Sequence, residues 1–370
     1  MPVLYVHNSE SVAGGNKILL TLVDQLRGSR FRPVAILPGG GPMEPELTRR
    51  DIPYITLDLT RVARGGRVTS ARLVVRIASW MRRQRVRLVH VNDPRYYRVT
   101  SVAARWLRVA RICHVHLLPG TSELAWAFKI PPHAAITCSM ALKTQLIGAL
   151  PSLPVDTWVA LPNAIDVEAV TPPADLAALR ERLGLDQKGF VVAIVGAVSE
   201  RKGHRYFLEM AQQVSAQAGR AEFLVVGDDT DGGRYRRAME QYARELGVEG
   251  RVRFLGFRRD APDWIAASDL VVLPSLHEGL PVSLMEAHAC AKPVVATEVD
   301  GIPEIVEDGV TGFLVSPADT AALTKAVLAL LSDEALRQRM GVAARARVER
   351  LFSARTYARR MERVYTRLLA

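Results

Sequence analysis

The stretch LPSLHEGLPVSLME, at residues 273–286, is the most informative part of the chain. It predicts a buried strand, a loop that crosses Gly279, and a helix that begins at Pro281, where a first-turn proline is well tolerated. Glu278 would lie on the loop and Glu286 one turn inside the helix. Both carboxylates could then point at one ligand.

The backbone of this stretch predicts an anion site. The amides of Gly279, Leu280, Val282 and Ser283 would form a positive nest at a helix N-terminus, which suits a phosphate. Two carboxylates beside it would repel a bare phosphate. They suit a ligand that joins phosphate to hydroxyl-rich groups at both ends, as a nucleotide sugar does. A solvated pair of glutamates remains the alternative at this point.

Outward from this stretch, short apolar segments alternate with amphipathic helices along all 370 residues, which is typical of α/β layering. In the first half we expect strands at 3–7, 33–37, 88–91, 112–115 and 135–137, and helices at 15–27, 43–50, 70–85, 100–109 and 141–147. In the second half we expect strands at 191–195, 222–226, 251–254, 270–273, 293–297 and 313–315, and helices at 205–218, 234–246, 261–266, 281–289, 302–306 and 318–331. The last forty residues are almost wholly helical.

The length exceeds what one ordinary core organises, so we expect two domains. A turn-rich segment at 162–173 indicates the hinge. The sequence therefore predicts two Rossmann-like α/β domains that face one another across a cleft, at 1–168 and 169–352. Ligands of such sheets bind at the carboxyl ends of the strands, so function should concentrate in the strand-to-helix loops.

Composition excludes several classes of protein. Hydrophobic residues make up 49% and charged residues 24%, which rules out disorder for the bulk of the chain. No apolar run is long enough for a membrane-spanning helix. The N-terminal residues 1–10 carry no basic region and indicate a buried strand, not a signal peptide. The three cysteines lack metal or redox spacing and predict reduced, structural thiols: Cys113, Cys138 and Cys290.

The positive charge is concentrated in the first half. Residues 1–170 hold 22 Lys and Arg against 11 acids, which accounts for the whole net charge of +11. The predicted helix at 70–85 gathers three arginines on one face: Arg72, Arg76 and Arg83. Such a face attracts anions. A solvated arginine face, contact with an anionic membrane surface and nucleic-acid binding are the alternatives, and no recognisable nucleic-acid module accompanies the charge.

Glu278 and Glu286, with seven residues between them, resemble the E-x7-E signature of retaining glycosyltransferase family 4, which has the GT-B fold. Further pieces of that family's pattern occur in order: Gly14-Gly15, His116, 162–166, Val195-Gly196, Arg201-Lys202-Gly203, Val226-Gly227-Asp228, 252–256, 301–306, Gly309 and Gly312. The resemblance covers nearly the whole chain. It implies a GT-B fold in which a C-terminal helix, at 353–370, packs back on the N-terminal domain.

The resemblance implies roles for the matching residues. Arg201 and Lys202 would hold the donor diphosphate, Glu278 the hydroxyls of the transferred sugar, and Glu286 the ribose. The donor site would also include Gly14, Gly15, Gly196, Phe257, Gly279, Leu280, Pro281 and Val282, with 255–257 beside the base. Ala197 stands where the family often has an arginine, so the second cation of the diphosphate site stays unassigned.

His116 would lie near the anomeric centre of the donor, where its carbonyl or imidazole could steady positive charge. His114, two positions earlier on the same side of a strand, is the rival candidate. The alternative for either residue is a histidine of the core whose ring nitrogens form hydrogen bonds within the protein.

The resemblance implies transfer of a hexosyl-type unit, with retention, from a nucleotide diphosphate sugar to an acceptor hydroxyl. UDP- or GDP-linked donors are expected before ADP-linked ones, and envelope polysaccharide, lipopolysaccharide or glycolipid assembly is the expected setting. We expect no cofactor and no metal, since Asp228-Asp229 followed by Asp231 is the nearest imitation of a metal ligand set. The protein would be cytoplasmic, with a lipid-linked acceptor and peripheral contact with the inner face of the cell membrane.

Three other classes of protein remain as alternatives. A sugar-nucleotide epimerase of the same fold would need no acceptor. A dinucleotide-dependent oxidoreductase would share the layers, but no strand runs into a complete G-x-G-x-x-G turn followed by an acid about twenty residues on. A non-enzymatic protein that binds nucleic acid or another anion would use the arginine-rich tract at 61–111.

Overall fold

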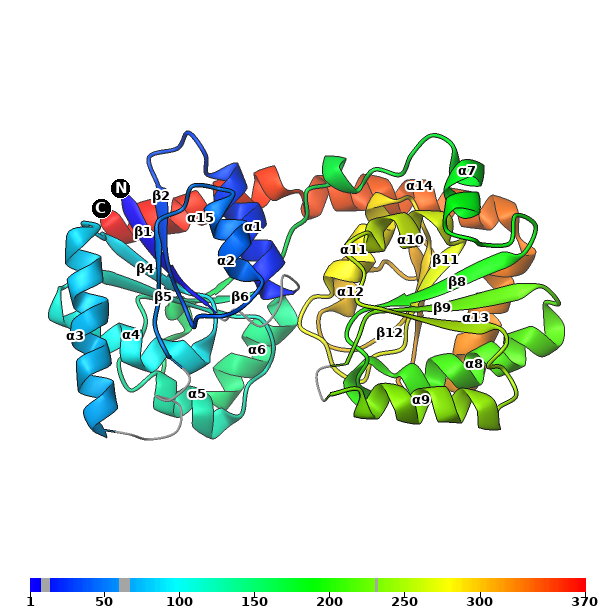
Figure 1. The fold of residues 1–370 in the computed structure, drawn as a ribbon, viewed down its shortest axis with the longest axis horizontal. Helices are drawn as coiled ribbons and strands as arrows, with labels where there is room; N and C mark the ends of the chain where they lie inside the picture. Colours follow the sequence, from blue (N-terminus) through cyan, green and yellow to red (C-terminus); the bar gives the residue numbers. More distant parts are fainter. Residues whose placement is uncertain (8–13, 60–66, 230–231) are drawn as a thin grey trace. The chain divides into compact units, whose positions relative to one another are not determined.

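The computed structural model describes residues 1–7, 14–59, 67–229 and 232–370. In the range 67–229, side chains are described from residue 71 on. The chain divides into two compact units (Figure 1). Unit 1 consists of Met1–Ala164 and Ala354–Ala370, and unit 2 of Ile165–Ser353. The first division thus falls a few residues before the expected one at 168.

Unit 1 is built on a parallel sheet of seven strands in the order β3-β2-β1-β4-β5-β6-β7. The strands are β1 (Pro2–Val6), β2 (Arg32–Leu37), β3 (Tyr54–Thr56), β4 (Leu88–Val91), β5 (Ala110–Val115), β6 (Ala134–Thr137) and β7 (Trp158–Ala160). The helices are α1 (Gly15–Gln25), α2 (Met43–Thr48), α3 (Arg67–Arg83), α4 (Pro94–Trp106), α5 (Thr121–Ala127), α6 (Met140–Ala149) and α15 (Ala354–Leu369). The central strands are buried along their length, as a parallel sheet covered on both faces requires.

The pattern misses three elements of unit 1: the edge strands β3 and β7, each of three residues, and the helix α5. It also places the start of α4 too late. That helix begins at Pro94 because the side chain of Asp93 accepts a hydrogen bond from the backbone amide of Arg95 and caps it. Proline fits the first helical position, where no amide is needed.

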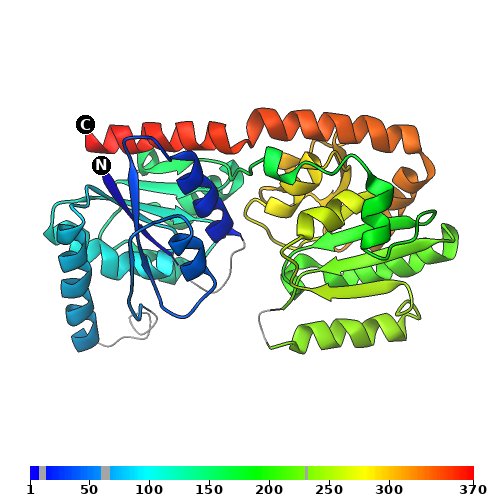
Figure 2. The same cartoon turned by 45° about the horizontal axis from the view of Figure 1, so that its top comes forward.

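The C-terminal helix α15 is part of unit 1. The hydroxyl of Tyr365 lies 2.6 Å from Nδ1 of His90 and 3.1 Å from the hydroxyl of Tyr5. All three side chains are buried, and the ring of Phe31 meets Tyr365 edge-on. The last helix therefore joins the core of the first sheet, and the two chain ends lie together in this unit (Figure 2).

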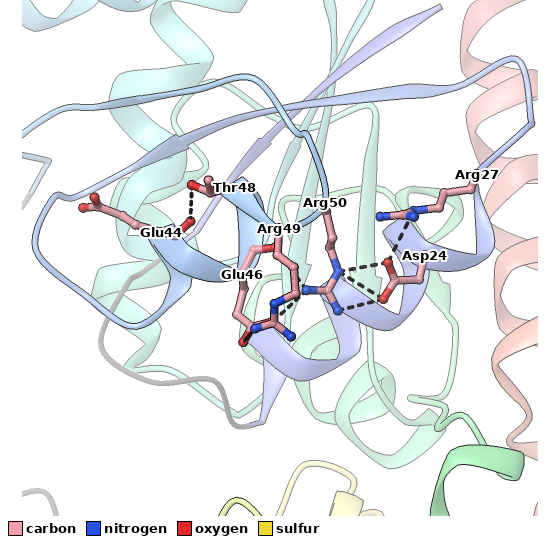
Figure 3. A network of polar contacts seen from close by, with 7 residues as sticks. All are labelled: Asp24, Arg27, Glu44, Glu46, Thr48, Arg49 and Arg50. Atoms are coloured by element: carbon pink, nitrogen blue, oxygen red, sulfur yellow. Dashed lines mark hydrogen bonds and ion pairs between the residues drawn. The ribbon is translucent and has the colours of Figure 1, made fainter.

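A polar network joins α1 to α2 in unit 1 (Figure 3). The guanidinium of Arg50 donates to both carboxylate oxygens of Asp24, at 2.8 to 3.1 Å, and to Oε2 of Glu46, at 2.6 Å. Burial alone would raise the pKa of Glu46, but hydrogen bonds from Arg50 and Arg49 outweigh it and lower that pKa. This planar fork of donors fixes α2 on the flank of the sheet.

Unit 2 contains a parallel sheet of six strands in the order β10-β9-β8-β11-β12-β13. The strands are β8 (Phe190–Val195), β9 (Ala221–Val226), β10 (Val252–Gly256), β11 (Leu270–Leu273), β12 (Val294–Thr297) and β13 (Gly312–Val315). The helices are α7 (Leu176–Arg182), α8 (His204–Gln217), α9 (Arg234–Glu245), α10 (Ala261–Ala267), α11 (Val282–Ala289), α12 (Ile302–Ile305), α13 (Thr320–Ser332) and α14 (Glu334–Leu351). Of these, only α7 lies outside the segments that the pattern predicts as helical.

Strand order places the switch points of the two sheets. In unit 2, β8 lies between β9 and β11, so the chain turns in opposite directions after β8 and after β11. In unit 1 the same reversal falls between β1 and β4. Ligands of doubly wound sheets bind at the carboxyl ends of the strands at such points. Among the described residues, no helix is both long enough and apolar enough to cross a membrane.

Candidate functional site

The candidate site of unit 2 is centred on a buried carboxylate. Oε1 of Glu278 lies 2.5 Å from Nζ of Lys202, and Oε2 lies 3.2 Å from Nη1 of Arg201. The hydroxyl of Ser275 also donates to Oε1 at 2.8 Å. Burial alone would raise the pKa of Glu278, but the charges of Lys202 and Arg201 outweigh it and hold that pKa below its ordinary value. The carboxylate is therefore ionised at neutral pH.

The loops after β8 and β11 are joined through their backbones. The amide of Leu276 donates to the carbonyl of Arg201, and the Arg201 guanidinium donates to the carbonyl of His277, both at 2.8 Å. Gly203 has a φ of +71°, and a Cβ there would stand 1.9 Å from the carbonyl oxygen of Pro274. Only glycine permits this close approach, which sets Lys202 against Glu278.

A third loop, after β12, also contacts the loop that carries Glu278. The hydroxyl of Thr297 donates to the carbonyl of Ser275 at 2.5 Å. Oδ2 of Asp300 accepts a hydrogen bond from the backbone amide of Glu278 at 2.8 Å. Sequence reasoning missed Asp300, because a single acid before a glycine turn carries no motif of its own.

The other residues predicted for the donor lie on neighbouring elements. The helix α11 begins at Val282 rather than at Pro281, which is extended and caps it. The first amides of α11 have no acceptor within the helix, as in any helix. Glu286 is buried on its second turn. Gly196 faces the Lys202 side chain, and Phe257, after β10, is 59% exposed.

In unit 1, Gly14 precedes α1 and Gly15 is its first residue, which lies against His116. Nε2 of His116 lies 2.9 Å from Oδ1 of Asn92, whose Nδ2 donates to the carbonyl of Gly15 at 3.1 Å. A carbonyl only accepts, so the amide nitrogen of Asn92 faces Gly15 and its oxygen faces His116. This assignment places the imidazole proton on Nε2. Burial lowers the pKa of His116 to about 4, which keeps the ring neutral at pH 7.

His114, the rival candidate, lies inside a stack of imidazoles. Its ring stacks on His116 at 4.0 Å and on His90 at 5.5 Å between centroids. It is 1% exposed, whereas His116 is only half-buried. Burial lowers the pKa of His90 to about 3 and the pKa of His114 well below its ordinary value. The geometry thus favours His116 over His114 as the residue that a ligand could touch.

The predicted basic face lies on α3. Arg72, Arg76 and Arg83 are exposed, while Leu73 and Ile77 on another side of the helix are buried in unit 1. The guanidinium of Arg82 lies 5.3 Å above the ring of Trp106, which is 56% exposed. Arg61 and Arg64 of the same tract lie outside the described residues.

Two of the acids that most resemble a metal ligand set, Asp228 and Asp229, bind other groups of the protein. The carboxylate of Asp229 accepts from the amides of Gly233 and Arg236, at 2.6 and 3.0 Å, and so caps α9. Asp228 pairs with the guanidinium of Arg236, and Asp231 lies outside the described residues. In the part of the chain that the structure describes, no three His, Cys, Asp or Glu residues are grouped so as to hold a metal ion.

Two open hollows lie away from the switch points. One, of about 710 Å³, is bordered by α2 and the glycines before it. The other, of about 640 Å³, lies at the amino ends of β8, β9 and β10. Neither is lined by Lys202 or Glu278. The charged cluster at the carboxyl edge is therefore the better candidate, because parallel sheets bind their ligands at that edge.

Two family models match the chain. Residues 189–333 match the model described as Glycosyl transferases group 1, and residues 13–147 match the model described as Glycosyl transferase 4-like domain. Each model falls on one of the two units. The chain therefore belongs to the glycosyltransferases of the family 4 type.

Similar proteins and a solved structure agree with this family assignment. Alpha-D-kanosaminyltransferase of Streptomyces kanamyceticus is 36% identical over 44% of this chain and 42% of its own length. A GDP-mannose-dependent monoacylated phosphatidylinositol monomannoside mannosyltransferase of Corynebacterium glutamicum is 34% identical over 52% of each chain. The chain thus spans about half the length of these relatives. The crystal structure of Anabaena HepE in complex with UDP has a TM-score of 0.85, with 25% identity over 99% of this chain and 100% of that one, which confirms the GT-B fold.

The contact between Gly15 and His116 generates a prediction for the substitution Gly15→Ala. The added Cβ would stand 2.7 Å from Cδ2 of the imidazole, which the His114 stack and Asn92 hold in place. Overpacking of this kind typically costs about 1–3 kcal/mol, so we expect unit 1 to be destabilised by that amount.

Urea unfolding followed by tryptophan fluorescence measures this loss, because four of the five tryptophans lie in unit 1. Gly148→Ala is the control, since no atom lies within 4 Å of a Cβ at that helical position. Equal stability of the two variants would contradict the packing described.

Proposed function

We propose that this protein transfers a hexosyl-type unit from a nucleotide diphosphate sugar to an acceptor hydroxyl, with retention at the anomeric carbon. The observation that carries the proposal is the Arg201–Lys202–Glu278 cluster at the switch point of unit 2, beside the start of α11. The cluster places two cations and one anion at the carboxyl edge of the sheet, which is the edge where doubly wound sheets bind nucleotides.

The two cations suit the donor diphosphate. Lys202 is 10% exposed at its side chain and Arg201 is 35% exposed, so both are held in place yet Arg201 can reach outward. Together with the first amides of α11 they would stabilise the charge that builds on the leaving nucleotide. Glu286, on the second turn of α11, is proposed to bind the ribose, and Phe257 to lie beside the base.

Glu278 is proposed to bind hydroxyls of the transferred sugar. Its carboxylate is ionised and shared between Lys202, Arg201 and Ser275, which suits hydrogen-bond acceptance more than covalent attack. The leaving phosphate oxygen would then accept the proton of the incoming hydroxyl on the same face of the sugar. A double displacement would instead need a nucleophilic carboxylate paired with an acid about 5 Å away, as in retaining glycosidases.

The donor is proposed to be UDP- or GDP-linked. A HepE structure that resembles this chain holds UDP, and the mannosyltransferase relative is GDP-mannose-dependent by name. A thermal-shift screen with UDP, GDP and ADP separates these possibilities, because a ligand of the folded state raises the melting temperature. Cell-envelope polysaccharide, lipopolysaccharide or glycolipid assembly is the proposed setting.

The site assignment predicts the effect of Glu278→Gln. The amide keeps the shape of the side chain but removes its charge, which leaves the buried Lys202 without its ion-pair partner. We therefore expect a loss of up to about 3–5 kcal/mol in the free energy of unfolding, and urea unfolding checks that the variant is folded before turnover is measured. We expect turnover to fall by about 10² to 10³, the range for removal of one stabilising group. Lys202→Met is expected mainly to weaken nucleotide diphosphate binding, measured by calorimetry.

Glu349→Gln is the matched control, since Glu349 pairs with Arg345 on α14 and is 53% exposed. Its turnover should equal that of the unmodified protein. Unchanged turnover in Glu278→Gln would refute the site. Donor consumption without any acceptor, with an epimer as product, would favour an epimerase over a transferase.

The proposal also predicts that transfer needs no divalent metal. Arg201, Lys202 and the amides of α11 supply the positive charge that a metal would otherwise supply to the diphosphate. Activity assayed in excess chelator should therefore remain within about twofold of the untreated protein. Near-total loss that magnesium or manganese restores would contradict this part of the proposal.

The basic face of α3 is proposed to contact an anionic membrane surface on its cytoplasmic side, which would present a lipid-linked acceptor. Each exposed arginine near such a surface contributes about 1 kcal/mol at low salt. We expect flotation with anionic vesicles that is lost in high salt and in a variant with Arg72, Arg76 and Arg83 replaced by serine. A variant with Arg220, Arg244 and Arg339 of unit 2 replaced is the control, and absence of flotation at low salt would refute membrane contact.

A further inference from the structure

Asp300 has an unusual backbone conformation for a residue with a side chain. Its φ is +46°, in the left-handed region that residues other than Gly, Asn and Asp rarely adopt. The next residue, Gly301, has a φ of −84° and shows no such conformation. A residue with a side chain thus occupies the left-handed position, although a glycine follows it.

The use of the side chain is visible in the structure. Oδ2 of Asp300 accepts a hydrogen bond from the backbone amide of Glu278 at 2.8 Å. Hydrogen bonds to a charged acceptor are shorter and about twice as strong as neutral ones. We propose that Asp300 is a positioning residue, which holds Glu278 in place through its backbone during glycosyl transfer. This inference rests on the proposed function of Glu278.

The turn that carries Asp300 is itself well fixed. The amide of Val299 donates to the carbonyl of Thr297, and the amide of Ile302 donates to the carbonyl of Val299. Thr297 ends β12, and its hydroxyl donates to the carbonyl of Ser275. Oδ2 of Asp300 also lies 3.5 Å from Nδ1 of His277. The loop after β12 therefore contacts the loop after β11 at Ser275, His277 and Glu278.

A backbone contact is needed because the contacts of the Glu278 side chain change when donor binds. In the structure, Lys202 and Arg201 both bind its carboxylate. A donor diphosphate competes for the same two cations, and their hold on Glu278 weakens as they turn to the phosphates. Asp300 binds the amide and not the carboxylate, so its contact survives this exchange. The carboxylate then stays where the sugar hydroxyls meet it.

Three variants test the role of Asp300. Asp300→Gly removes the hydrogen bond and is compatible with the positive φ, so we expect the fold to be retained. Asp300→Asn keeps an oxygen acceptor and a residue that tolerates the left-handed region. Ala318→Gly is the matched control, because Ala318 also has a positive φ, +61°, in an exposed turn of unit 2. Hydrogen exchange of the Glu278 amide, kcat, KM for the donor and the affinity for UDP are measured in each.

We expect Asp300→Gly to lower kcat by about ten- to a hundredfold, as small misplacements of a catalytic group do. The affinity for UDP should stay within twofold, because Lys202 and Arg201 are untouched. The Glu278 amide should exchange at least tenfold faster. Asp300→Asn should restore both kcat and slow exchange to within about threefold, and Ala318→Gly should resemble the unmodified protein.

The outcomes separate this inference from the proposed function. Unchanged kcat and unchanged Glu278 exchange in Asp300→Gly would overturn the positioning role, even if the protein is an active transferase. Faster exchange in that variant, with no transfer by the unmodified protein from any donor, would leave the contact established and refute the transferase assignment. A fall in kcat that Asp300→Asn fails to restore would also overturn the role of the hydrogen bond.

Discussion

The buried ion pair between Lys202 and Glu278 is the constraint on which the site of unit 2 depends. Removing two charges from water is costly, and their attraction compensates for it only in a close, hydrogen-bonded arrangement. The close approach of Gly203 to Pro274 and the bonds between the loops after β8 and β11 supply that arrangement. The sheet order, which makes β8 and β11 neighbours, is what brings the two halves of the pair together.

In the Arg201–Lys202–Glu278 cluster two cations share one carboxylate, and this shapes how a donor would bind. Each cation that turns to a diphosphate leaves the Glu278 carboxylate, so binding exchanges one set of charge pairs for another. The carboxylate then becomes available to hydroxyl groups, which are the groups a sugar offers. Contacts to the backbone of Glu278 and the carbonyl of Ser275 do not take part in this exchange. These two contacts would keep the loop in place while the cations change partners, including Arg201, whose guanidinium also donates to the carbonyl of His277.

Much of this arrangement could be predicted from the sequence. Apolar runs predict the central strands of both sheets, and the stretch at 273–286 predicts the loop that carries Glu278 and the helix that carries Glu286. The edge strands β3 and β7 are too short to show a pattern. The contacts of Asp300 and the tautomer of His116 could not be predicted, because both depend on atoms from strands distant in the sequence. Which of His114 and His116 is accessible likewise follows only from their stacking.

The most direct test of the account is a crystal structure of the protein with an intact nucleotide diphosphate sugar bound. The account predicts that Lys202 and the first amides of α11 contact the diphosphate, and that Glu278 contacts hydroxyls of the sugar while its amide remains bonded to Asp300. A donor bound elsewhere, with Lys202 and Glu278 still paired as in the free protein, would contradict it.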